Sequence, residues 1–182
     1  MTSKNYFYKL TTICLLFVFT VGFTQIATAA ITEQEVKNAQ QAWGSGLVSI
    51  GKAFTEKKDY TKAASDLIDN LYAYQTGQVL FNPTKTSKIV FRSTKEGALS
   101  YFVGHNKKYP EDKGFALAPW TNVRFQNAGI IINDNVAFAM GQYFFTPTKG
   151  ALVKVDYTFG YEKYADGEVK IVLHHSSLPY SE

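Results

Sequence analysis

The sequence predicts an α+β domain, with helices in its N-terminal half and an antiparallel sheet in its C-terminal half. In the first half, apolar residues recur at three- and four-residue spacing, which is the period of an amphipathic helix. From Trp120 onward, apolar residues alternate with polar ones, which is the period of a strand. Helices followed by a run of strands are typical of α+β folds.

Residues 1–29 have the composition of a cleaved secretory signal peptide. Lys4 and Lys9 precede an apolar stretch over 13–23, and small residues follow it. The stretch is shorter than the roughly 20 residues that span a bilayer, which argues against a membrane anchor. We therefore expect one mature domain over 30–182, periplasmic or secreted, with no membrane contact after cleavage.

The composition of the predicted mature domain excludes several kinds of site. The single cysteine, Cys14, lies in the predicted signal peptide, so we expect neither a disulfide nor a thiolate metal site. Removal of Lys4 and Lys9 lowers the formal net charge from +4 to +2, which is too weak to indicate binding to nucleic acid. The sequence also has no phosphate-binding glycine loop and no nucleophile elbow. We expect no metal and no cofactor.

Capping signals mark the starts of the predicted helices. Thr32 and Glu35 have the spacing of a capping box ahead of a long apolar stripe. Ser93 or Thr94 is expected to cap a third helix, with Glu96 at the capping-box distance from Ser93. The predicted helices cover 32–58, from 59 or 60 to 77, and from 93 or 94 to 103, and a polar loop over 105–119 follows.

Strand signals occupy the remainder of the chain. Two short apolar segments, 79–81 and 88–91, predict strands between the second and third helices. The Asp166–Gly167 pair between alternating segments is the strongest hairpin signal in the sequence. The long strands are expected at 120–127, 129–133, 135–146, 151–163 and 168–177.

Several local motifs resemble the nuclear transport factor 2-like, or cystatin-like cone, superfamily. The segments 120–125 and 172–177, with the Asp166–Gly167 turn, are similar to the association domain of calcium/calmodulin-dependent kinase II. The segments 96–104 and 174–180 are similar to exported bacterial relatives of that domain. The resemblance implies a cone in which N-terminal helices pack on a curved antiparallel sheet.

The resemblance also bears on function. It aligns His175 with the second histidine of the family's terminal His-x-His-x-Ser motif, whereas Leu173 replaces the first. Gly160 stands where the kinase domain has an arginine, so a cavity built around that arginine is not carried over. The kinase domain assembles subunits, which implies that this chain associates with itself.

The predicted last hairpin brings two candidate catalytic residues together. A two-residue turn at Asp166–Gly167 sets a register that pairs Thr158 with His175 and places Asp156 diagonal to His175. A carboxylate that fixes an imidazole is the arrangement of a general base. A structural hydrogen bond is the alternative. His174 points to the opposite face, so the two histidines cannot bind one metal.

The predicted ligand cavity lies at the same end of the sheet. Arg92 and Arg124 could bind a small carboxylate-bearing ligand together with His175 and Asp156. Structural ion pairs of these arginines with Asp156 or Glu162 are the alternative. The other residues expected to line the cavity are Trp120, Tyr101 and Tyr143.

The opposite face of the predicted hairpin is strongly apolar. Because one layer of helices cannot cover both faces of such a sheet, we expect a homodimer or higher oligomer. Tyr157, Phe159 and Tyr161 are the predicted interface residues. The expected function is therefore that of an exported small-ligand-binding or self-assembling domain. A cofactor-independent isomerase, cyclase or dehydratase that uses the His/Asp pair is the alternative, and whether the chain is an enzyme stays open.

Overall fold

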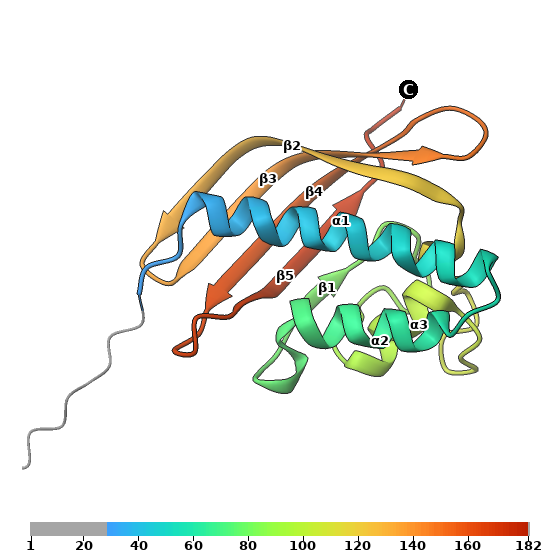
Figure 1. Ribbon diagram of the computed structural model, residues 1–182, viewed down its shortest axis with the longest axis horizontal. Helices are drawn as coiled ribbons and strands as arrows, with labels where there is room; N and C mark the ends of the chain where they lie inside the picture. The colour runs from blue at the N-terminus through green and yellow to red at the C-terminus, as the bar shows by residue number, and fades with distance from the viewer. Residues whose placement is uncertain (1–28, 182) are drawn as a thin grey trace, which may run out of the picture.

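Three helices pack on one face of a curved five-stranded sheet (Figure 1). The computed structural model describes residues 29–181, so the predicted signal peptide lies outside the described residues apart from Ala29. Within 29–181, no helix has both the length and the apolar character needed to cross a membrane. The predicted α+β cone is confirmed.

Each helix begins after a capping side chain. Thr32 Oγ1 accepts a hydrogen bond from the Glu35 backbone N–H at 3.2 Å, and the Glu35 carboxylate accepts one from the Thr32 N–H at 2.8 Å, which completes the predicted capping box. Asp59 and Thr94 each cap a later helix through one hydrogen bond. The helices are α1 (Glu33–Thr55), α2 (Tyr60–Leu71) and α3 (Lys95–Val103).

The second helix ends earlier than the sequence predicts. α2 stops at Leu71, because Tyr72 takes an extended conformation and forms a parallel bridge with Ile171. A short 3-10 turn, η1 (Ala73–Gln75), follows. This break buries the Tyr72 ring in the core, where only 1% of the residue is exposed.

The sheet has the order β1-β5-β4-β3-β2 and is mixed, since β1 runs parallel to β5 and the other pairs are antiparallel. The predicted strands 120–127 and 129–133 form a single strand with a bulge. The predicted strand 88–91 is instead a loop. The strands are β1 (Leu80–Asn82), β2 (Trp120–Asn133), β3 (Val136–Pro147), β4 (Val153–Lys163) and β5 (Val169–Ser177), and a second 3-10 turn, η2 (Phe115–Leu117), precedes β2.

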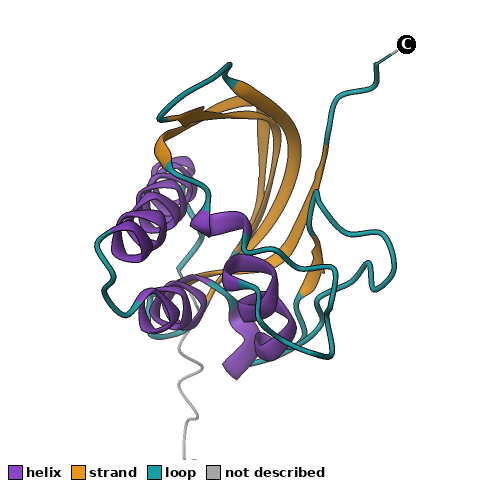
Figure 2. Cartoon of the chain, turned by 90° about the vertical axis from the view of Figure 1, so that its right-hand side faces the viewer, coloured by secondary structure: helices purple, strands orange, loops and turns teal. Residues whose placement is uncertain are grey.

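The sheet curls around a core of aromatic side chains, and Figure 2 shows its arch over the helices. Trp43 of α1 lies at the centre, with its ring 5.5–6.4 Å from six aromatic rings of α3 and the sheet. The bulge in β2 helps to bend the sheet and requires a glycine opposite it. A Cβ at Gly141 would lie 2.1 Å from the backbone oxygen of Gln126.

The two faces of the sheet differ from the prediction. Tyr157, Phe159 and Tyr161, which were the predicted interface residues, are each at most 2% exposed. They lie on the inner face, against the helices, and so cannot form a surface for another chain. The outer face carries Phe138 and Met140, which are 45% and 59% exposed.

Candidate active site

A cluster of hydroxyl groups lies where β1 and β5 end side by side. The parallel pairing of Asn82 with His175 brings the loop after β1 alongside the end of β5. Thr84 Oγ1 from this loop donates a hydrogen bond to Ser176 Oγ at 2.9 Å. Ser176 faces inward from β5 and is 4% exposed. Two hydroxyls from distant parts of the chain are thus fixed against each other.

Two tyrosines complete the hydroxyl cluster. Tyr101 of α3 and Tyr143 of β3 are 5% and 2% exposed. Burial raises the pKa of Tyr143, and hydrogen bonding to Ser176 and Thr84 lowers it only in part. Burial likewise raises the pKa of Tyr101. Its hydrogen bonds to the Lys85 backbone and to Thr84 lower this pKa by a smaller amount. Both phenols therefore stay protonated at neutral pH and can donate hydrogen bonds.

His174 is the imidazole that reaches the interior. Its ring is stacked between Phe159 and Phe81, with centroids 4.1 Å and 4.6 Å away. Only 2% of the residue is exposed. Burial, and secondarily the neighbouring His175, lowers the pKa of His174 well below its usual value. The ring is therefore neutral at neutral pH.

The hydrogen-bond partners of His174 assign its tautomer. The Trp43 indole N–H donates to the Tyr72 oxygen at 2.9 Å, and that oxygen lies 2.8 Å from His174 Nδ1. Since the indole can only donate, the phenol hydrogen of Tyr72 is left for Nδ1. We assign the ring hydrogen to Nε2 on this network. Nε2 is buried and has no partner among residues 29–181, so it is a donor available to a ligand.

A surface groove reaches one member of this cluster, Tyr101. It has a volume of about 500 Å³, and its walls include Lys85, Tyr101, Phe115 and Trp120. Trp120 donates its indole N–H to the Phe115 backbone oxygen at 3.0 Å, which fixes that wall. A larger groove of about 600 Å³ lies between α1 and β2, but none of the hydroxyl cluster lines it. The buried polar groups, rather than groove size, identify the site.

The predicted His/Asp pair lies elsewhere. The register pairs Thr158 with His175 as predicted, and Asp156 and His175 line one hollow on the outer face of the sheet. The Asp156 carboxylate accepts a hydrogen bond from Gln142 Nε2 at 2.9 Å. Between Asp156 and His175 no hydrogen bond forms. The structure therefore separates this pair from Tyr101 and Tyr143, which lie on the inner side of the sheet.

Neither arginine contributes a cation to the hydroxyl cluster. Arg92 is fully buried and pairs with Asp112 at 2.6 Å. Arg92 therefore forms a structural ion pair, which was the alternative to ligand binding in the sequence analysis. Its partner is Asp112 and not the expected Asp156 or Glu162. Arg124 is on the surface, with its guanidinium 4.2 Å from the centre of the Phe144 ring.

Thr84, Ser176 and His174 were not among the predicted site residues. One strand carries two adjacent histidines followed by two adjacent serines. Because side chains alternate along a strand, one histidine and one serine face inward, but alternation alone does not say which member of each pair does so. Thr84 lies in a loop without a motif. Only the β1–β5 pairing places it in the site.

Comparison with known proteins identifies the relatives of the chain. A family model described as metal-independent carbonic anhydrase matches residues 34–178. A metal-independent carbonic anhydrase of Nostoc sp. (strain PCC 7120 / SAG 25.82 / UTEX 2576) is 48% identical over 162 residues, which cover 87% of this chain and 79% of that protein. The iota-carbonic anhydrase from a cyanobacterium, solved in complex with bicarbonate, has a TM-score of 0.83 at 46% identity, over 87% of this chain and 99% of that one.

More distant structures share the fold alone. A protein from Xanthomonas campestris, described as a calcium/calmodulin dependent protein kinase II association domain, has a TM-score of 0.56 at 21% identity, over 87% of this chain and 99% of that one. Another solved structure is described as a member of the nuclear transport factor 2-like family. The predicted cone fold of this superfamily is confirmed.

The predicted function is wrong. A generic ligand-binding or assembly domain does not account for the family match, and neither does the alternative of an isomerase, cyclase or dehydratase. The distant relatives that suggested these functions share only the cone, and one cone can host many unrelated chemistries. The match over 34–178 and the 48% identity show instead that the chain belongs to the metal-independent carbonic anhydrase family.

Proposed function

We propose that the protein interconverts carbon dioxide and bicarbonate without a metal ion, at the cluster of Thr84, Tyr101, Tyr143, Ser176 and His174. The observation that carries the proposal is the convergence of four hydroxyls in a buried, aromatic-walled site. The unpaired Nε2–H of His174 belongs to the inward-facing residue two positions before Ser176 on β5. A related protein with 46% identity was solved with bicarbonate bound, which supports a ligand of this kind.

The aromatic walls suit the apolar substrate, and the hydroxyls suit the product. In the hydration direction a water oxygen attacks the carbon of carbon dioxide, a C–O bond forms, and negative charge develops on the substrate oxygens. Buried donors aimed at that charge act without reorganising, which makes them effective in a site shielded from water. The Ser176 hydroxyl, the phenols of Tyr101 and Tyr143 and the Nε2–H of His174 supply such donors, whereas Thr84 uses its own hydrogen to orient Ser176.

The attacking water must lose one proton for bicarbonate to form. The raised pKa values of Tyr101 and Tyr143 keep these phenols protonated, so they act as donors and not as bases. The Ser176–Thr84 hydrogen bond joins the interior to the loop that carries Lys85 at the groove. The proton passes along these hydroxyls to bulk water at the groove, and each hydroxyl reorients as it accepts one hydrogen and donates another.

Exchange of oxygen-18 between carbon dioxide and water tests this function. Ser176→Ala is expected to lower kcat/KM roughly 100-fold or more, the usual scale for losing one donor to a developing oxyanion. Ser177→Ala is the matched control, because the neighbouring serine lines the outer hollow and should leave the rate unchanged. A wild-type protein that catalyses no exchange, or a Ser176→Ala variant as active as wild type, would refute the proposal.

We further propose that the mature protein is exported and that it self-associates through the outer face of the sheet. The composition of residues 1–29 supports export. Exposed apolar side chains on the outer face, among them Phe138 and Met140, support self-association. Mass spectrometry of the protein recovered from the periplasm should find a chain that begins at Ala30 or Ile31. A full-length chain retained in the membrane would contradict export.

A further inference from the structure

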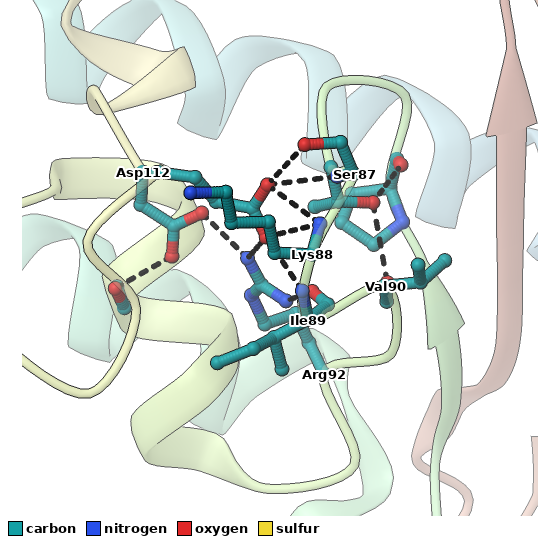
Figure 3. A network of polar contacts seen from close by, with 10 residues as sticks. Ser87, Lys88, Ile89, Val90, Arg92 and Asp112 are labelled. Atoms are coloured by element: carbon teal, nitrogen blue, oxygen red, sulfur yellow. Dashed lines mark hydrogen bonds and ion pairs between the residues drawn. The ribbon is translucent and has the colours of Figure 1, made fainter.

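The loop that carries Thr84 has no regular secondary structure of its own. It runs from the end of β1 at Asn82 to the cap of α3 at Thr94. A catalytic hydroxyl on such a loop needs an external support, because a displacement of about 1 Å can cost roughly 100-fold in rate. Figure 3 shows a polar network at the base of this loop.

Glu111 lies at the centre of that network. Its carboxylate accepts hydrogen bonds from the backbone N–H groups of Ser87, Lys88 and Ile89, at 2.8, 3.0 and 2.8 Å, and from Ser87 Oγ at 2.8 Å. These bonds lower the pKa of Glu111 to about 2, so the group is ionised throughout the physiological range. One side chain thus satisfies three successive donors of the loop.

A second part of the network joins the loop to α3. The buried Arg92 guanidinium pairs with the Asp112 carboxylate at 2.6 Å, donates to the Ile89 backbone oxygen and lies 3.8 Å from the Glu111 carboxylate. The other oxygen of Asp112 accepts a hydrogen bond from Ser100 Oγ at 2.6 Å. Ser100 precedes Tyr101 on α3, so the same network fixes both partners of the Thr84–Tyr101 contact.

We propose that Glu111 is a positioning residue of the reaction, which holds the 83–94 loop so that Thr84 stays against Ser176 and Tyr101. The inference rests on the proposed function. Glu111 acts through Thr84 and does not itself join the hydroxyl cluster. A carboxylate is required because it only accepts hydrogen bonds, whereas a carboxamide would turn its own N–H groups toward the loop donors.

The first test is the rate of the Glu111→Gln variant. We expect kcat/KM for oxygen-18 exchange to fall about 10- to 100-fold, the scale of a small displacement of a reacting group. Amide hydrogen exchange at residues 87–89 should become faster. Glu168→Gln is the matched control, since the exposed Glu168 pairs with Lys170 at the hairpin end of β5, away from the 83–94 loop. Unchanged kcat/KM in Glu111→Gln would overturn the inference.

A double-mutant cycle with Thr84→Ala separates positioning from a general loss of structure. If Glu111 acts through Thr84, adding Glu111→Gln to Thr84→Ala should change kcat/KM less than twofold. Two losses that multiply would overturn the positioning role. If Glu111→Gln does not fold, Glu111→Asp takes its place in the same cycle, with the same two outcomes. A wild-type protein without activity would instead overturn the proposed function, which distinguishes the two failures.

Discussion

His174 shows how one buried side chain links the chemistry of the site to the stability of the fold. The ring is enclosed by Phe81 and Phe159, and among residues 29–181 its one hydrogen-bond partner is Tyr72. Placing a charge there would remove it from water without a compensating carboxylate. The fold therefore accommodates the neutral ring, and the same enclosure leaves Nε2 free to act as a donor.

This enclosure predicts a specific pH dependence of stability. The unfolded chain takes up a proton on His174 as pH falls through about 6.5, whereas the folded chain, with its lowered pKa, does so only at much lower pH. The free energy of unfolding should therefore fall by up to about 1.4 kcal/mol per pH unit below pH 6.5. Thermal unfolding of wild type and His174→Asn between pH 7 and 5 measures the difference.

In His174→Asn this part of the pH dependence should disappear, whereas His175→Asn should retain it, because His175 is exposed. Equal slopes for wild type and His174→Asn would show that the burial of His174 does not set the pH dependence.

Among the site residues, the sequence singled out Tyr101 and Tyr143 but not their polar partners. Aromatic side chains in alternating or helical patterns are expected to lie in the interior, so the sequence pattern could predict the positions of the two tyrosines. It could not predict the position of Thr84, which depends on a parallel pairing between segments about 90 residues apart. His175 was chosen over His174 by alignment with a distant family motif, and the local burial of the strand decides otherwise.

At the scale of an element, the bulge that bends the sheet depends on one glycine. Gly141 lies opposite the β2 bulge, where a Cβ would overlap the Gln126 backbone oxygen at 2.1 Å. Gly141→Ala should lower the free energy of unfolding by about 1–3 kcal/mol, the scale of overpacking in a core. Gly129→Ala is the control, because nothing lies within 4 Å of its Cβ position. Chemical denaturation curves measure both, and equal midpoints would contradict this account.

In the last hairpin, the predicted pairing of Thr158 with His175 is correct although the predicted turn is not, because two register shifts cancel. The turn pairs Tyr164 with Glu168 and so has three loop residues, with Gly167 at a φ of 87°, instead of the predicted two. That shifts the register by one. A bulge between the Gly160–Leu173 and Tyr161–Ile171 pairs shifts it back, so Thr158 still faces His175. The turn residues are visible in the sequence, but the bulge follows from tertiary packing.

At the scale of the whole molecule, one row of residues crosses the outer face of all five strands. Register partners place Leu80, Leu173, Gly160, Phe138 and Ile131 side by side from β1 to β2. Three of them are large apolar residues that are 45–69% exposed. The sequence predicted that one face of the sheet would need a partner. This row lies on the face that the helices leave uncovered, because they already cover the face that carries Tyr157.

The outer row predicts a dimer that a single charge should weaken. An exposed apolar row of this length is unusual on a monomer and suits a sheet-to-sheet contact between two copies. Light scattering at micromolar concentration should find the wild-type protein as a dimer or larger. Phe138→Glu should raise the dissociation constant of the dimer at least tenfold, since association would bury the charge without a partner. Leu152→Glu, on the exposed turn after β3, should leave association unchanged. A monomeric wild-type protein, or equal effects of the two variants on association, would rule out this interface. Oxygen-18 exchange should persist in Phe138→Glu, because the hydroxyl cluster is assembled within one chain.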